Sequence, residues 1–217
     1  MPGRSRPRSR ACLVSPLAAA VALAFPIAAA PGSSRADETF GVSFAIAEEE
    51  KHPVQPDAWI EAQLASAEKL FGPLGVHFRW TQKKPLAAEH TRLESRRDRD
   101  VLEAELERGV INVFVVASLR DVDDPSLYRM GVCWRRGNEG KPYLVVAASA
   151  RPTVLAHELG HFFGNPHSST PNNVMSYVRT DAEVFFDEGQ MRTIRVWAKR
   201  HVADRWVLPL GPAKFFP

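Results

Sequence analysis

The first 36 residues of this 217-residue chain contain none of its 25 acidic side chains. Residues 13–30 form an apolar, alanine-rich run, and Ser34-Arg35-Ala36 offers small residues for cleavage. The run is preceded by four basic residues, Arg4, Arg6, Arg8 and Arg10. This order is typical of a signal peptide, which we predict spans residues 1–36 and exports the protein to the periplasm or the medium. Two prolines, Pro16 and Pro26, interrupt the run and argue against the alternative of an uncleaved membrane anchor.

Cysteine is equally scarce, because Cys12 falls in the predicted signal and Cys133 alone follows it. No disulfide can form within residues 37–217, so Cys133 is expected to be an unpaired structural thiol. Without residues 1–36 the chain has 23 Lys and Arg against 25 Asp and Glu, a formal charge of −2. The full-length pI of about 9.0 therefore does not indicate nucleic-acid binding. No later run is apolar enough to span a membrane.

Apolar patterning over residues 37–217 predicts a single α/β domain in which strands and helices alternate. The run 110–117 (VINVFVVA) is apolar throughout, as expected of a central strand covered on both faces. Further strands are expected at 40–47, 76–81 and 143–148, with an edge strand at 130–134. Helices are expected at 57–71 (with Asp57 as N-cap), 98–108, 152–163 and 188–203.

Two histidines and a glutamate lie within the helix expected at 152–163. His157 and His161 are four residues apart, so they share one helix face about 6 Å apart and can bind one metal ion. Glu158 projects about a third of a turn away from His157. Its carboxylate can therefore act on a water molecule at the metal without being a ligand itself.

A third histidine follows the helix at a short distance. Gly164 permits a sharp turn, and Pro166 stiffens the segment that returns His167 as a third ligand. Three protein ligands with the fourth position left to water are typical of a catalytic zinc site. The alternative without a metal has two histidines that pack or cap a helix and a third in a loop. The fixed spacing of His157, Glu158, His161 and His167 argues against it.

The segment His157–His167 (HELGHFFGNPH) resembles the metzincin consensus HExxHxxGxxH at every fixed position. Downstream, Asn173–Tyr177 (NVMSY) is similar to the Met-turn of that clan, with Met175 as its methionine. The resemblance implies an α/β (α+β) fold: one catalytic domain with a mixed twisted sheet, an active-site helix, a Met-turn and a C-terminal helix. Asn165 departs from the pattern, since an apolar residue is usual there.

The resemblance also implies roles for residues outside the histidine motif. Tyr177 is similar to the tyrosine of astacins and pappalysin-like members, which binds the metal or the oxyanion. Phe185-Phe186 with Gln190 and Arg192 resembles pappalysin-like bacterial members, whereas Ser168 is more matrixin-like, so the subfamily stays open. In the clan an upper edge strand pairs with extended substrate.

The implied activity is that of a secreted zinc endopeptidase, in which Glu158 accepts a proton from water and passes it to the leaving amine. Its expected partner is a protein or peptide substrate, with neither nucleic acid nor membrane, and the chain is expected to be a monomer. One alternative is an inactive zinc-binding module of the same fold that binds a protein partner. A second is a gluzincin-type site with Glu183 or Glu188 as third ligand.

A cluster of three carboxylates, Asp121, Asp123 and Asp124, lies in the loop-rich segment 121–140. Oxygen ligands of this kind could hold calcium. A solvated acidic turn is the commoner arrangement for such a cluster, and both interpretations stay open. The histidines outside the motif lack metal-ligand spacing and are expected to be ordinary.

Overall fold

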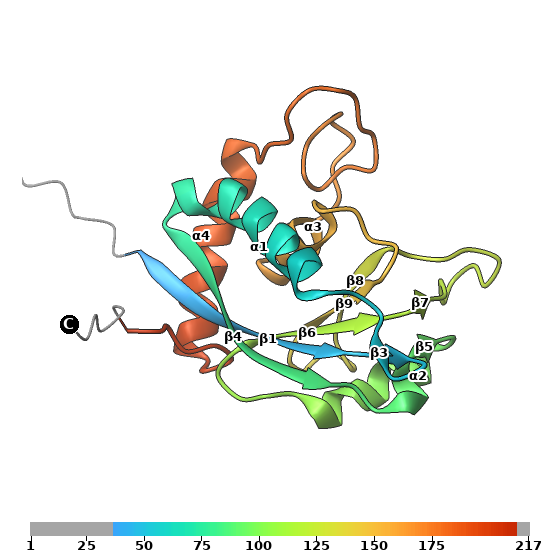
Figure 1. The fold of residues 1–217 in the computed structure, drawn as a ribbon. Coiled ribbons are helices and arrows are strands. Elements are labelled where there is room, and N and C mark those ends of the chain that lie inside the picture. Colours follow the sequence, from blue (N-terminus) through green and yellow to red (C-terminus); the bar gives the residue numbers. More distant parts are fainter. Residues whose placement is uncertain (1–36, 212–217) are drawn as a thin grey trace, which may run out of the picture. The chain divides into compact units, whose positions relative to one another are not determined.

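A five-stranded sheet forms the centre of the computed structural model, which describes residues 37–211 (Figure 1). The predicted signal peptide lies outside the described residues. The strand order is β4-β1-β6-β9-β8. Four neighbouring strands run parallel, and β8 pairs antiparallel with β9 at one edge. The strands are β1 (Glu38–Ile46), β4 (Val76–Pro85), β6 (Ile111–Val116), β8 (Gly131–Trp134) and β9 (Tyr143–Ala147).

Strand β6 is buried at every position, as its uninterrupted apolar sequence predicts. Successive side chains point to opposite faces of a sheet. Val113 and Val115 accordingly join the hydrophobic cluster that contains residues of α1, α3 and α4. Phe114 and Val116 join a second cluster on the opposite face. Both faces of the sheet are therefore covered, which confirms the predicted α/β class.

Three long helices pack on the same face of the sheet: α1 (Asp57–Phe71), α3 (Val154–Phe162) and α4 (Glu188–Ala203). Figure 1 shows α1 and α3 side by side on that face, and α2 (Arg96–Asp100) on the other. Helix α3 therefore lies between α1 and the edge strand β8.

The helix expected at 98–108 begins earlier and is shorter. Ser95 caps α2 by accepting the Asp98 N–H, and the Asp98 side chain accepts the Ser95 N–H in return. A 3-10 helix (Val101–Glu105) then replaces the expected α-helical turns. In the same way Asp57 is the first residue of α1 and not its N-cap, which is Pro56.

Several short elements complete the described chain. Strands β2 (Glu48–Glu49) and β3 (His52–Pro53) pair antiparallel, while β5 (Arg92–Leu93) and β7 (Ser118–Leu119) pair parallel. Further 3-10 helices lie at Gly72–Leu74 and Ala88–His90. Elements of two or three residues carry too little periodicity to be predicted from sequence.

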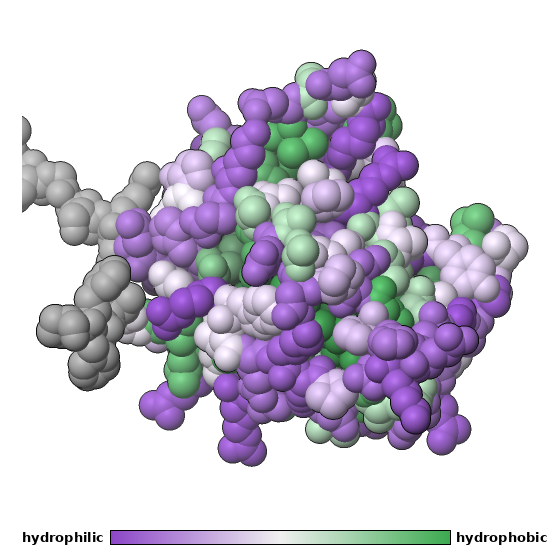
Figure 2. Space-filling model, in the orientation of Figure 1, coloured by the Kyte–Doolittle hydropathy of each residue, from purple (hydrophilic) through white to green (hydrophobic). Residues whose placement is uncertain are grey.

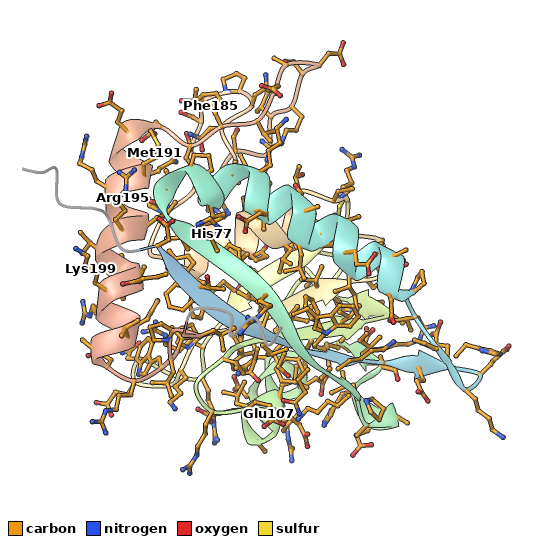
Figure 3. All side chains as sticks on the ribbon, turned by 60° about the vertical axis from the view of Figure 1, so that its left-hand side comes forward. His77, Glu107, Phe185, Met191, Arg195 and Lys199 are labelled. Carbon is orange, nitrogen blue, oxygen red and sulfur yellow. The ribbon has the colours of Figure 1, made fainter. Side chains whose placement is uncertain are left out.

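The surface of the described residues mixes polar and apolar side chains, which are interspersed over the face drawn in Figure 2. Among residues 37–211, none of the helices has the length and apolar character needed to cross a bilayer. His77 lies beside α1 (Figure 3), with Nδ1 2.5 Å from Glu68 Oε1. Its ring therefore pairs with a carboxylate of α1.

Candidate metal centre

Helix α3 is held at its start by a side chain from α1. The first N–H groups of a helix lack partners within it, and Thr153 supplies no side-chain cap here. Gln63, which is buried, compensates: its Oε1 accepts the Leu155 N–H at 3.1 Å, and its Nε2 donates to the Arg151 carbonyl at 2.9 Å. Gln63 therefore fixes the position of the helix that carries His157, although no sequence pattern singled it out.

The three predicted ligands lie together in the structure. His157 and His161 are one turn apart on α3, and His167 returns after a turn at Gly164, whose φ of 81° suits glycine. Nε2 of His161 lies 3.2 Å from Nε2 of His157 and 3.0 Å from Nε2 of His167. Among the described residues this triad is the metal-ligand cluster that the structure forms.

Backbone carbonyls orient two of the rings. Nδ1 of His157 lies 2.7 Å from the Val174 oxygen, and Nδ1 of His161 lies 2.8 Å from the Asn165 oxygen. Because a carbonyl can only accept, each Nδ1 carries the proton and each Nε2 presents a lone pair. Burial lowers the pKa of His157, and it lowers that of His161 to about 4, so both rings are neutral at pH 7.

This donor set fits a zinc ion. Two lone pairs facing each other at 3.2 Å, on His157 and His161, repel unless a cation lies between them. Neutral imidazole nitrogens are ordinary zinc ligands, and a second hydrogen bond through the other ring nitrogen is their usual support. The residues present therefore suit the metal that the sequence predicts.

Glu158 lies beside the triad against the edge strand β8. Its side chain is buried, and burial raises the pKa of the carboxyl to about 8 in the absence of a metal charge. A Cβ placed on Gly131 would lie 2.7 Å from Glu158 Oε1. Glycine at this position of β8 therefore makes room for the carboxylate.

Met175 lies beneath α3, where the Met-turn resemblance places it. A Cβ on Gly160 would lie 2.3 Å from its Sδ, so the sulfur packs against the helix backbone between the two helical histidines. The Asn173 side chain accepts the Met175 N–H at 2.9 Å and exchanges hydrogen bonds with Gln190 of α4. The C-terminal helix thus braces the turn.

Tyr177 reaches over the open side of the triad. Its hydroxyl lies 2.7 Å from Nε2 of His167, while two-thirds of the residue is exposed. Partial burial raises the pKa of Tyr177, so the phenol stays protonated at neutral pH. The hydroxyl is therefore a proton donor next to the metal ligands.

Two further residues support the ligands and were not predicted to do so. Arg179 donates to the carbonyls of Asn173 (2.8 Å) and Val174 (2.9 Å), and the latter is the carbonyl that orients His157. Asn165 supports His161 through its backbone carbonyl, which any residue would provide. Its buried Nδ2 has no hydrogen-bond partner in the described part of the chain. An isolated arginine and a backbone contact leave no signal in the sequence.

The three carboxylates considered for calcium each have a protein partner. The pairs are Asp121–Arg129 at 2.5 Å, Asp123–Arg96 at 2.5 Å and Asp124–Ser126 at 2.6 Å. Two of the carboxylates thus pair with arginines, and Asp124 accepts a hydrogen bond from a hydroxyl. The glutamates of the gluzincin alternative pair elsewhere, Glu183 with Lys69 at 2.6 Å and Glu188 with Arg192 at 3.5 Å.

Cys133 of β8 is a free thiol, and burial raises its pKa, which keeps it protonated and unreactive. Two hollows open beside this strand. One, of about 470 Å³, extends past Cys133 toward Trp134, and the other, of about 300 Å³, extends toward Thr153 at the start of α3. Both include Glu158 and Tyr177, so the site opens on two sides of the triad.

No protein-family model and no curated protein matches this sequence. Solved structures do match its fold. Metalloproteinase-II from Bacteroides fragilis aligns with a TM-score of 0.54 at 13% identity, over 77% of this chain and 55% of that one. The present chain thus spans about half the length of that protein.

Two shorter structures align over nearly their whole length. Archaemetzincin from Methanopyrus kandleri gives a TM-score of 0.50 at 16% identity, over 77% of this chain and 99% of that one. Mature mirolysin of Tannerella forsythia, in complex with a cleaved peptide, gives 0.52 at 11% identity, over 78% and 98%. At such identities the likeness establishes a shared fold, and it confirms the predicted metzincin-like architecture.

Proposed function

We propose that this protein is a zinc-dependent endopeptidase, exported by residues 1–36 and acting on protein or peptide substrates as a monomer. One observation carries the proposal: three imidazole Nε2 atoms converge beside a buried glutamate in a site open on two sides. The fold shared with metallopeptidases supports it. Zinc retention alone does not need Glu158, which argues against an inactive zinc-binding module.

In this site His157, His161 and His167 would hold the zinc ion. When bound, the ion supplies Lewis-acid polarisation of the attacking water and of the peptide carbonyl. Glu158 accepts a proton from the water as its oxygen forms a bond to the carbonyl carbon. Glu158 then returns the proton to the amine nitrogen as the C–N bond breaks. The Tyr177 hydroxyl donates toward the carbonyl oxygen, which gains negative charge.

Cleavage within a chain requires room for substrate on both sides of the scissile bond. The two hollows provide it, with β8 running along both of them through Gly131. Strand β8 pairs with β9 on one side only, since it is the last strand of the sheet. The edge of β8 that faces away from β9 can therefore pair with an extended substrate peptide.

The experiment that tests the proposal uses Glu158→Gln in residues 37–217 purified without chelator. Glutamine keeps the shape but cannot take up the proton, so turnover of a casein or peptide-library substrate should fall by several orders of magnitude. The zinc content should stay near one per chain, because the ligands are untouched. Near-wild-type turnover of the variant, or proteolysis by a zinc-free preparation, would show that the proposed chemistry is wrong.

A further inference from the structure

Arg129 lies where the acidic turn meets the edge strand β8. Its side chain lines both hollows, together with Gly131, Glu158 and Tyr177. The two hollows share five lining residues, and Arg129 is the arginine among them, beside His157 and Glu158. Its side chain therefore borders both halves of the cleft.

Asp121 holds the guanidinium in place. Nε of Arg129 donates to Asp121 Oδ2 at 2.5 Å, and Nη2 lies 2.5 Å from the same oxygen. The Asp121 side chain is only 3% exposed, and its Oδ1 accepts the backbone N–H groups of Asp123 (2.9 Å) and Asp124 (3.4 Å). A buried, backbone-anchored carboxylate thus fixes the direction of the arginine side chain.

This arrangement leaves one nitrogen of the guanidinium outside the pair with Asp121. Nη1 is the nitrogen that Asp121 does not engage, and 43% of the side chain is exposed. The guanidinium also lies within hydrogen-bonding reach of the Tyr177 hydroxyl, which itself lies 2.7 Å from His167 Nε2.

We propose that Arg129 is a further catalytic residue, whose Nη1–H group donates to the carbonyl oxygen of the scissile peptide as negative charge develops there. The role rests on the proposed peptidase function. A donor held before the reaction stabilises the transition state more than the ground state, because no reorientation is needed as the charge forms. Asp121 is the positioning residue in this pair, and it gives the acidic turn a function other than cation binding.

The test compares Arg129→Met with Arg96→Met. Arg96 forms the other arginine–aspartate pair of the acidic turn, with Asp123, but does not line either hollow. The substrate is a peptide without acidic side chains, acetylated and amidated at its ends, so that simple attraction of carboxylates by arginine plays no part. Arg129→Met should lower kcat by about a hundredfold to a thousandfold with little change in KM. Arg96→Met should leave both constants unchanged.

A binding measurement supplies a readout independent of turnover. A phosphinic peptide mimics the charged tetrahedral species, so its calorimetric affinity for the zinc-loaded protein should fall in Arg129→Met by a factor similar to that in kcat. In a Glu158→Gln background, affinity for the uncleaved neutral peptide should not change. Unchanged kcat and inhibitor affinity, or a rise in KM alone, would overturn the proposal.

Two controls keep these outcomes distinct. If Arg129→Met loses zinc or unfolds at a lower urea concentration than wild type, the Asp121→Asn variant tests the role instead. Asparagine can still accept the backbone N–H groups, but it lacks the charge that orients Arg129. It should lower kcat without raising KM, and an unchanged kcat would overturn the proposal. A zinc-loaded wild type that cleaves no peptide refutes the peptidase function and this role together, whereas an active wild type with an unimpaired Arg129→Met refutes the role alone.

Discussion

Met175 packs directly against the backbone of Gly160 beneath the metal ligands. A methyl group added at Gly160 would lie 2.3 Å from Met175 Sδ and 3.2 Å from Met175 Cε. Such a contact is far inside van der Waals separation, so the methionine would have to move. Its backbone is fixed by hydrogen bonds to the Asn173 side chain and to Ser168 (2.9 Å each). The side chain of Met175 would therefore change rotamer within a core in which it is 0% exposed.

The expected cost of Gly160→Ala combines two opposing effects. Overpacking a core costs about 1–3 kcal/mol, while alanine in place of glycine inside a helix gains about 1 kcal/mol. The net loss of stability should be about 0–2 kcal/mol. Met175→Ala alone should cost about 2–5 kcal/mol through the cavity it leaves. In that background the sign reverses, because the methyl group of Gly160→Ala no longer clashes and the helix gains about 1 kcal/mol.

Urea unfolding of the four proteins, followed by circular dichroism in the presence of chelator, measures this cycle without a contribution from zinc binding. The coupling free energy between the two sites should be about 1–3 kcal/mol. Gly160→Ala should also lower zinc affinity in the wild-type background, because the displaced Met175 side chain no longer supports the helix beneath His157 and His161. An equal effect of Gly160→Ala in both backgrounds would refute the view that Met175 packs against this glycine.

Two further predictions concern Tyr177 and His201. Tyr177→Phe removes only a hydroxyl that lies 2.7 Å from His167 Nε2, so kcat should fall about tenfold to a thousandfold at unchanged zinc content. Unchanged turnover would show that Tyr177 has only a packing role. His201 is fully buried and its pKa is lowered by burial, so the unfolded chain binds a proton that the folded chain excludes. Its contribution is present above the unfolded pKa of about 6.5 and is lost as pH falls below it, with a slope of at most about 1.4 kcal/mol per pH unit. His201→Gln can still donate to the Phe162 carbonyl, so its free energy of unfolding in chelator should fall less steeply at low pH than that of the wild type. Parallel plots of the free energy of unfolding against pH for the two proteins would contradict this prediction.

The metal ligands could be predicted from sequence because their geometry is local. Four residues of helix bring His157 and His161 to one face, and the turn at Gly164 needs only three further residues to return His167. The strands were predictable for a similar reason, because the consecutive apolar residues of β6 indicate a strand that is buried on both faces. Boundaries were less certain: Ser95 and Asp98 form a capping box that starts α2 earlier than the apolar pattern indicated.

The supporting residues could not be predicted, because their partners are distant in sequence. Gln63 binds the Leu155 N–H at the start of α3, 92 positions further along the chain. Arg179 donates to the Val174 carbonyl, which also contacts His157, 17 positions before Val174. Neither interaction produces periodicity. A buried glutamine on an amphipathic helix reads as an ordinary polar residue until the neighbouring helix is in place.

The acidic turn shows how the same residues support opposite interpretations. Three aspartates within four positions suggest a cation site when only their own spacing is considered. Asp121 instead meets Arg129, eight residues later, because the turn folds back and places Tyr128 opposite Arg120. The carboxylate that could have bound a metal ion thus orients a cation of the chain itself. We expect the side of Arg129 that Asp121 does not engage to act on the substrate, because Arg129 borders both hollows of the cleft.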